Sequence, residues 1–368
     1  MAGVVILIMS ATGVLLAFEK QIVQRAEKNV RVVAVPSGGT RLPIEELLIK
    51  VNENGGGLPS IVSWHPEANS SVELGYGRDK TVFVNPYSGA VVGESAKGLR
   101  KLFGSVEGWH RWLGAGPEKR QPWRAVTGAC NLAFFFLICS GLYLWMPRSA
   151  AGFKTVFWFR GGLTGKARDF NWHNTIGFWC CMPLFVMVMS SVVMSYPWAN
   201  NLVYRAAASP LPPQGPPSAP AGGQRLKSGI SLDGLNPLGA TAEKKIAEWN
   251  TISLRLPADS DVAAVFSIDT GNGGQPAKRS QLTLDRKTGA ETKWETYKSY
   301  SRGRQWRVWM RFAHTGEVYG LAGQFIATLA SLGGVFLVCT GISLALRRFF
   351  AWRESVVARE AASSLTAR

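Results

Sequence analysis

The 368-residue chain combines a hydrophobic fraction of 46% with a charged fraction of only 18%, and its mean hydropathy is +0.05. This balance favours a membrane protein with a substantial water-soluble part. The net charge of +17 does not indicate a nucleic-acid partner, because the Lys and Arg residues do not gather on one stripe or tail. All five cysteines fall in apolar runs, which excludes a disulfide framework and a zinc motif.

Four uncharged apolar runs reach the length of roughly 18 residues that a membrane-spanning helix needs. They cover residues 1–18, 125–146, 176–198 and 321–346. A signal peptide is the alternative for the first run, but it has no basic start and no small-residue cleavage site before Glu19. We therefore expect four transmembrane helices, the first of them a retained anchor.

The orientation follows from the short connection at residues 147–175, because basic residues in short loops mark the cytoplasmic side. This loop and the tail at residues 347–368 are expected inside, so both termini are cytoplasmic. The long segments at residues 19–124 and 199–320 are then outside, in the periplasm of a bacterium with two membranes. The expected location is the inner membrane, with lipid as a partner. The loop's charged residues are Arg148, Lys154, Arg160, Lys166, Arg168 and the single acid Asp169.

The two outer segments contain the same strand–turn–strand pattern, with a turn glycine at Gly89 in the first and Gly289 in the second. A helix-like stretch precedes each pattern, at residues 42–51 and 242–249. Each segment therefore predicts a small α+β unit. Residues 209–223 are dense in Pro, Gly and Ala and predict a linker.

Three of the four runs also contain a hydroxyl–glycine pair: Thr12-Gly13, Ser140-Gly141 and Thr340-Gly341. We interpret these pairs as small residues that let helices approach closely.

Three of the four histidines stand at the start of an apolar run: His110, His173 and His314. A single such histidine is most simply an interfacial ring, but three in equivalent places favour axial ligands of haem iron. His110 and His314 precede runs that enter from outside, whereas His173 precedes a run that starts inside. We therefore predict an outer haem held by His110 and His314 and an inner one held by His173. His65, in the middle of the first outer segment, is expected to be an ordinary surface or half-buried ring.

Arginines interleaved with tryptophans surround the predicted outer pair. Guanidinium groups could bind haem propionates or an anionic ligand there, and an equally weighted alternative is a belt at the membrane edge. The arginines are Arg111, Arg124, Arg302, Arg304, Arg307 and Arg311. The sequence has no nucleotide-binding fingerprint, so an electron donor must come from elsewhere.

With these motifs the chain resembles the PepSY-associated transmembrane family, which includes inner-membrane siderophore-iron reductases of the ferrioxamine-reductase type. The resemblance covers nearly the whole chain, and the segments around Gly89 and Gly289 look like the PepSY signature. The most telling matches are WHRWLG at residues 109–114, SGLYLWMPR at 140–148, NWH at 171–173, HTG at 314–316 and TG at 340–341.

The resemblance implies a mainly α membrane protein with four transmembrane helices and two periplasmic PepSY-like α+β units. It implies two b-type haems that carry electrons outward to ferric siderophore, releasing ferrous iron. The donor, cytoplasmic or a quinol, is not specified. Family members usually begin with a further histidine-containing segment, and this sequence begins inside the first run, so the second ligand of the inner haem is unidentified. Three alternatives stay open: a true start upstream of Met1, an open or non-histidine position at the inner haem, or no inner haem. The alternative function is a non-catalytic PepSY module that binds peptides or restrains proteases. A permease is disfavoured because no run carries an intramembrane carboxylate.

Overall fold

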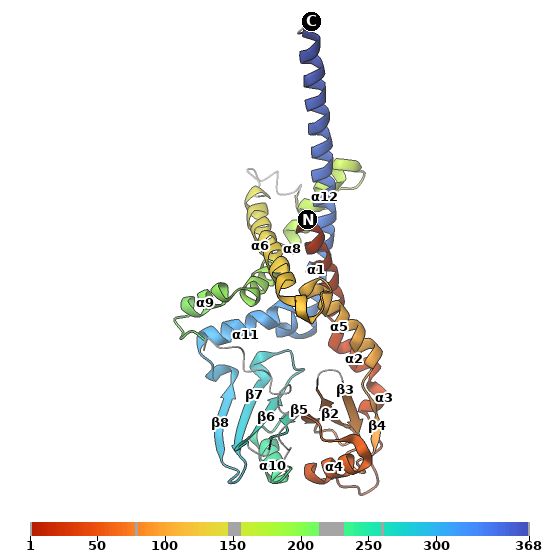
Figure 1. Ribbon diagram of the computed structural model, residues 1–368, viewed down its shortest axis with the longest axis vertical. Helices are drawn as coiled ribbons and strands as arrows, with labels where there is room; N and C mark the ends of the chain where they lie inside the picture. The colour runs from red at the N-terminus through yellow and green to blue at the C-terminus, as the bar shows by residue number, and fades with distance from the viewer. Residues whose placement is uncertain (1, 78–79, 146–155, 213–231, 259–260, 367–368) are drawn as a thin grey trace.

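The structure is a computed structural model that describes residues 2–77, 80–145, 156–212, 232–258 and 261–366. The molecule is elongated, with a β-sheet at one end, a group of helices in the middle and the last part of α12 extending from the other end (Figure 1). Most of the expected linker at residues 209–223 and part of the expected loop at 147–175 lie outside the described residues.

The chain contains two similar series of elements, each with a helix, then four strands, then another helix. The helices are α1 Ala2–Leu16, α2 Glu19–Ala26, α3 Lys28–Arg31, α4 Ile44–Val51, α5 Lys97–Trp112, α6 Arg120–Trp145, α8 Gly165–Ser195, α9 Pro197–Ala206, α10 Leu235–Lys245, α11 Arg302–His314 and α12 Gly320–Thr366. The strands are β1 Ile61–Trp64, β2 Val72–Tyr76, β3 Lys80–Val84, β4 Val91–Glu94, β5 Thr251–Arg255, β6 Ala263–Asp269, β7 Arg279–Asp285 and β8 Glu291–Thr296.

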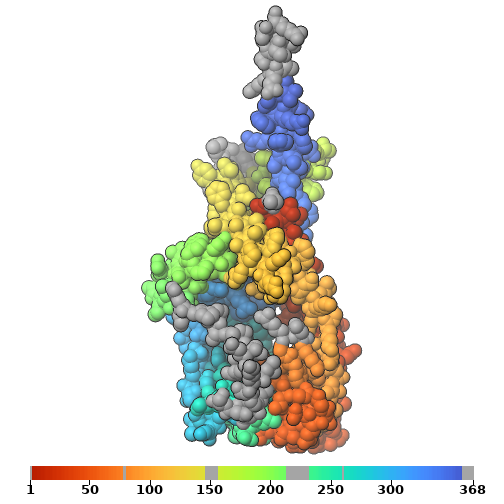
Figure 2. Space-filling view, viewed as in Figure 1, coloured from red at the N-terminus to blue at the C-terminus, as the bar shows by residue number. Residues whose placement is uncertain are grey.

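All eight strands form one antiparallel sheet in the order β4-β3-β2-β1-β5-β6-β7-β8. The central pair, β1 with β5, joins the two halves, with Ile61 opposite Arg255 and Trp64 opposite Ile252. We expected two separate units, whereas the structure pairs their first strands edge to edge. The two halves consequently lie side by side as one body (Figure 2).

The turn of each half has the geometry that the sequence predicted. Gly89 and Gly289 have φ of 75° and 70°, a conformation that glycine adopts without steric cost. Each glycine N–H donates to the carbonyl oxygen four residues earlier, of Asn85 or Asp285, at 2.9 Å. A register shift in the strand that leads into the turn lies at the same place in both halves, between Phe83 and Val84 and between Thr283 and Leu284. The expected internal repeat is therefore present in this detail.

One face of the sheet packs against α4 and α10, and the core between them spans both halves. The two helices are also joined at their first turns. The Asn236 N–H donates to Glu45 Oε1 at 2.9 Å, and the Glu45 N–H donates to Asn236 Oδ1 at 3.1 Å. The central core side chains include Leu48, Val62, Leu74, Val84, Leu235, Leu238, Ile252, Leu254, Phe266, Leu282 and Leu284.

The second helix does not lie at residues 242–249 as we expected. It is α10, Leu235–Lys245, and the chain is already extended at Ile246. Leu235, Leu238 and Ala242 are fully buried at helical spacing, so the apolar face that fixes the helix begins earlier.

Three helical segments in the described chain are long and apolar enough to cross a membrane, within Lys97–Trp145, Gly165–Ser195 and Glu317–Ala358. A fourth arises if α1 and α2, bent by 41°, count as one span. Large apolar side chains on these helices stay exposed, for example Phe136 at 69% and Leu144 at 80%. Such a surface is suited to lipid contact. The third apolar run does not continue as one helix to residue 198, because the backbone is extended at Tyr196 and a new helix starts at Pro197.

The bend between α1 and α2 is stabilised by a side chain of α12. Gln324 is 1% exposed, and its Nε2 donates to the Ala17 carbonyl oxygen at 2.7 Å. Its Oε1 accepts a hydrogen bond from Gln21 Nε2 at 2.6 Å. A backbone carbonyl freed by the bend is thus satisfied without water, as a buried polar group requires.

Candidate functional site

A cavity of about 590 Å³ lies where α1, α5, α6, α8, α11 and α12 meet. We call it the sheet-proximal cavity, because two of the helices that line it, α5 and α11, lie next to the sheet (Figure 1). Most of its surface is apolar, and its polar groups come from the histidines and arginines described below together with Glu107, Asn131 and several Ser and Thr hydroxyls. Its lining includes Met9, Gly13, Leu16, Glu107, His110, Arg111, Arg124, Thr127, Asn131, Phe134, Leu184, Met187, Ser191, Met194, Arg307, Arg311, His314, Ala327 and Ser331.

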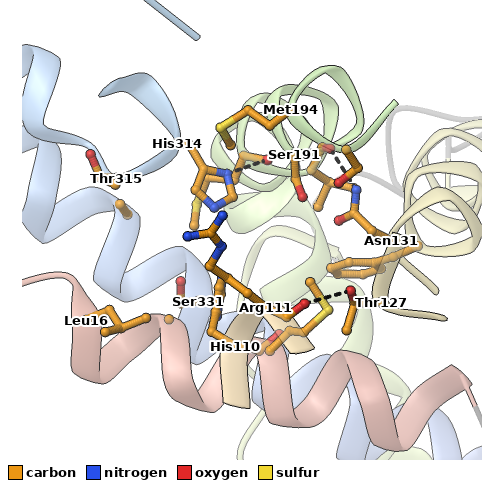
Figure 3. A pocket seen from close by; sticks show the side chains of 18 of the residues that line it. Leu16, His110, Arg111, Thr127, Asn131, Ser191, Met194, His314, Thr315 and Ser331 are labelled. Atoms are coloured by element: carbon orange, nitrogen blue, oxygen red, sulfur yellow. Dashed lines mark hydrogen bonds between the residues drawn. The ribbon is translucent and has the colours of Figure 1, made fainter. Parts of the chain in front are cut away.

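His110 and His314 both line this cavity and lie close together, as the sequence led us to expect (Figure 3). Their ring centroids are 6.3 Å apart and the ring planes make an angle of 67°. Each histidine lies near the end of the helix that follows the fourth strand of its half, His110 in α5 and His314 in α11. The repeated order of the two halves therefore brings one imidazole from each to the same place.

The position of His314 depends on a close contact between two glycines. Gly316 has a φ of 76°, and a Cβ added to it would lie 2.3 Å from the Gly323 carbonyl oxygen. A Cβ on Gly323 would lie 2.1 Å from the Gly316 carbonyl oxygen. Because neither site has room for a side chain, the HTG motif sets how tightly α11 turns into α12.

The Nδ1 atoms of both cavity histidines are hydrogen-bonded. His110 Nδ1 lies 2.9 Å from Thr12 Oγ1. His314 Nδ1 lies 2.8 Å from the Met187 carbonyl oxygen and 3.2 Å from Ser190 Oγ. A carbonyl oxygen only accepts, so His314 Nδ1 carries the proton and its Nε2 keeps a lone pair.

Four arginines line the cavity, accompanied by the single carboxylate of Glu107. Arg111 bonds Glu107 at 2.7 Å, and Arg124 donates to the Met194 carbonyl oxygen at 3.1 Å. Arg307 Nε donates to Asn200 Oδ1 at 3.0 Å, and burial lowers the pKa of this guanidinium from its ordinary value. The fourth is Arg311. This excess of positive charge can bind an anionic group of a ligand.

Two of the six arginines that the sequence suggested for this site, Arg302 and Arg304, do not line the cavity. Arg304 is absent from the cavity lining, bonds Glu295 at 3.0 Å and stacks over Tyr300, with its Cζ 3.6 Å from the ring centroid. Arg302 is exposed in the first turn of α11. The later arginines of α11, Arg307 and Arg311, therefore line the cavity, whereas Arg304 bonds a residue of β8 and Arg302 is exposed.

His173 lies apart from this pair, on the first half of α8. Its Nδ1 is 2.9 Å from Thr340 Oγ1, and its Cε1 lies 3.4 Å from where a Cβ on Gly341 would be. Ser331 of α12 lines the sheet-proximal cavity, and Thr340 follows nine residues later, which is about 14 Å along a helix. The chain's remaining histidine, His65, directly follows β1, so the His173 site has one imidazole from the described chain.

His65 belongs to a charged group on the first half of the sheet. Its Nδ1 lies 2.7 Å from the Asn250 carbonyl oxygen, and its Nε2 lies 3.3 Å from Glu73 Oε1. Although burial lowers the pKa of His65, the hydrogen bonds to Glu73 and Asn250 outweigh it, so the pKa is raised above 6.5. The residue has a structural ion-pair environment, away from the cavity.

The contacts of Thr12 and Thr340 were missed in the sequence, where we interpreted the hydroxyl–glycine pairs only as helix packing. Gly13 does pack against Ser331 of α12, but a Cβ on it would also lie 3.6 Å from His110 Cε1. The recurrence of the pair was a usable signal. Ser140-Gly141 differs, because within the described residues no atom beyond its own helix backbone and chain neighbours lies within 4 Å of a Cβ on Gly141.

Within the described residues no three His, Cys, Asp or Glu side chains form a metal-binding group. Two imidazoles are nevertheless sufficient as axial ligands when a porphyrin supplies the other four.

A family model described as "PepSY-associated TM region" matches residues 1–348. Together with the long apolar helices, this match identifies a mainly helical membrane protein. A comparison with curated proteins gave no match.

Proposed function

This chain belongs to the PepSY-associated TM family, and from that premise we propose that it is a haem-containing membrane reductase. In this proposal it passes electrons across the bacterial inner membrane to ferric siderophore in the periplasm. The spacing of His110 and His314 is the observation that carries the proposal.

Two imidazoles that ligate one iron through Nε2 have a predictable separation. With about 2 Å from iron to nitrogen and about 1.1 Å from nitrogen to the ring centroid, the two centroids lie about 6.2 Å apart. The structure has 6.3 Å between His110 and His314. The Nδ1 atoms point away to Thr12 and Met187, which leaves the Nε2 atoms for iron.

The remaining lining also fits a b-type haem. Residues such as Phe134 and Leu184 provide an apolar wall for the macrocycle, while the cavity arginines would bind its two propionates. When bound, the haem supplies one-electron chemistry at its iron. The protein's own part is to hold the imidazoles and arginines in place and to exclude water from the apolar wall.

His173 would hold a second haem, about 14 Å farther along α12. We propose four spans, α1 with α2, α6, α8 and α12, with both termini and residues 147–175 in the cytoplasm. The two haem sites then lie at different depths of a hydrocarbon core about 30 Å thick. In this topology the sheet, as two PepSY-like units, is periplasmic.

The acceptor is proposed to be outside, because the sheet and α4, α10, α5 and α11 lie on that side (Figure 1). One electron from a cytoplasmic or quinol donor would reduce one ferric ion to ferrous. Hydroxamate oxygens hold ferrous iron less firmly than ferric iron, so reduction would release the metal.

The test is an absorption spectrum of the purified protein followed by a single-turnover reaction. We expect a Soret band and, after reduction with dithionite and its removal, reoxidation when a ferric hydroxamate siderophore is added. Trapped ferrous iron should appear at the same rate. A protein without a Soret band would instead fit a non-catalytic PepSY module. Haem that stays reduced would show that the acceptor is wrong.

A further inference from the structure

Each histidine of the two proposed haem sites contacts a hydroxyl group of a different apolar helix. His110 contacts Thr12 of α1, His314 contacts Ser190 of α8, and His173 contacts Thr340 of α12. In each case the atom on the imidazole is Nδ1. The same arrangement thus occurs three times, on three helices and at both depths.

The direction of these hydrogen bonds follows from the other contact of each threonine. Thr12 Oγ1 donates to the Ile8 carbonyl oxygen at 2.6 Å, and Thr340 Oγ1 donates to the Phe336 carbonyl oxygen at 2.7 Å. A hydroxyl has one proton, so a threonine that has donated it can only accept from the imidazole. His110 and His173 therefore carry their proton on Nδ1 and keep the Nε2 lone pair free.

We propose that Thr12 and Thr340, with Ser190 in a weaker role, are positioning residues that fix the tautomer and ring plane of the three histidines. The consequence for a ligand rests on the proposed function, because the fixed lone pair at Nε2 is the one that would meet haem iron. Ser190 is weaker because His314 Nδ1 also donates to the Met187 carbonyl oxygen.

The glycine that follows each threonine packs against the imidazole ring of the histidine. A Cβ on Gly13 would lie 3.6 Å from His110 Cε1, and one on Gly341 would lie 3.4 Å from His173 Cε1. Each ring therefore lies on a surface without a side chain, while the neighbouring hydroxyl holds its Nδ1. Together, contact and hydrogen bond leave the ring little freedom to rotate.

Hydrogen bonds from Ser and Thr to carbonyls one turn earlier are common in membrane helices and do not by themselves indicate a role. Ser140 shows this, because its Oγ donates to the Phe136 carbonyl oxygen at 2.9 Å with no histidine beside it in the described chain. The same backbone bond therefore occurs with and without an imidazole. Ser140 is for this reason the matched control.

The experiment compares Thr12→Val, Thr340→Val and Ser140→Ala, with Thr12→Ser and Thr340→Ser as variants that keep the hydroxyl. The first measurement is the rate of haem transfer to apomyoglobin, together with the low-spin electron paramagnetic resonance signal of each haem. We expect Thr12→Val to release the outer haem, and Thr340→Val the inner one, about 10- to 100-fold faster. Ser140→Ala and both serine variants should behave as wild type.

The second measurement does not depend on haem. In haem-free protein labelled with ¹⁵N-histidine, Nδ1 of His110 and His173 should be protonated, and each valine variant should shift its own histidine to a tautomer mixture. If wild type binds no haem, the proposed function fails, and this measurement still tests the tautomer. Unchanged tautomers and unchanged haem release in both valine variants would overturn the inference, as would an equal effect of Ser140→Ala.

Discussion

The sheet-proximal cavity and the His173 site both contain a histidine held by a hydroxyl group, but they differ in how many imidazoles and arginines they bring together. The cavity has two imidazoles, from α5 and α11, that lie 6.3 Å apart, with four arginines beside them. The His173 site has one imidazole and its threonine. The two histidines of the cavity are on the helices that follow the fourth strand of each half, so folding of the sheet brings them together. His173 is on α8, and the sheet brings no second imidazole to it.

Removing one histidine should have the largest effect on this comparison. We expect His314→Ala to abolish the low-spin signal of the outer haem and to leave the inner haem bound, since the two sites share no ligand. His173→Ala should do the reverse. Pyridine haemochrome counts and electron paramagnetic resonance measure both, with His65→Ala as the control. Full haem content in His110→Ala and His314→Ala would contradict the assignment of this cavity.

Removing the charge of the cavity arginines should have a smaller effect. A hydrogen bond to a charged group is worth about 1.5–3 kcal/mol, so Arg307→Gln or Arg311→Gln should weaken retention of the outer haem about 10- to 100-fold. Arg304→Gln is the matched control on the same helix, because Arg304 bonds Glu295 and is absent from the cavity lining. Competition with apomyoglobin measures retention. Equal losses from Arg304→Gln would favour a general role of these arginines at the membrane edge.

The smallest effect concerns the ion pair of His65 and Glu73, which lies apart from both sites. The pKa of His65 is raised above 6.5, so its contribution to stability is complete below that value and is lost as the pH rises through the folded-state pKa. The pKa of Glu73, although burial raises it, is lowered from 4.5 by His65 and Arg31, so its contribution is lost as the pH falls. The pair is therefore most stabilising between these two ordinary values.

Accordingly, His65→Gln should lower the thermal midpoint by about 1–3 °C at about pH 5.5 and by less at about pH 8.5. Haem spectra should not change at either pH. A midpoint difference that grows with pH would contradict the pairing.

Local features of the fold could be predicted from the sequence because they depend on neighbouring residues. The turns at Gly89 and Gly289 and the apolar runs are of this kind. The pattern at residues 242–249 predicts the wrong bounds for α10, because the buried repeat that fixes this helix, Leu235, Leu238 and Ala242, begins earlier. The joining of β1 to β5 could not be predicted, since pairing of two strand edges leaves no local signal.

For the site, the equivalent places of His110 and His314 predicted that they would lie close together. Their hydroxyl partners were not predicted, because Thr12 lies 98 positions from His110 and its only local signal, the recurring hydroxyl–glycine pair, also occurs at Ser140-Gly141 without a histidine contact in the described chain. Arg304 differs from Arg307 and Arg311 because Glu295 and Tyr300 lie within its reach. Glu295 is on β8, so the sequence of the helix alone does not show that Arg304 has this partner.

The pairing of β1 with β5 also has a consequence for biosynthesis. Ser63 and Ser253, hydrogen-bonded across these strands at 2.8 Å, are 190 positions apart. At about 5–20 residues per second, the ribosome needs about 10–40 s to pass from one strand to the other. Through this interval β1 is an unpaired edge, and the second imidazole of the cavity has not been made. A ligand held by both halves can therefore be loaded only after synthesis of α11, whereas the β1 edge stays exposed only until β5 pairs with it.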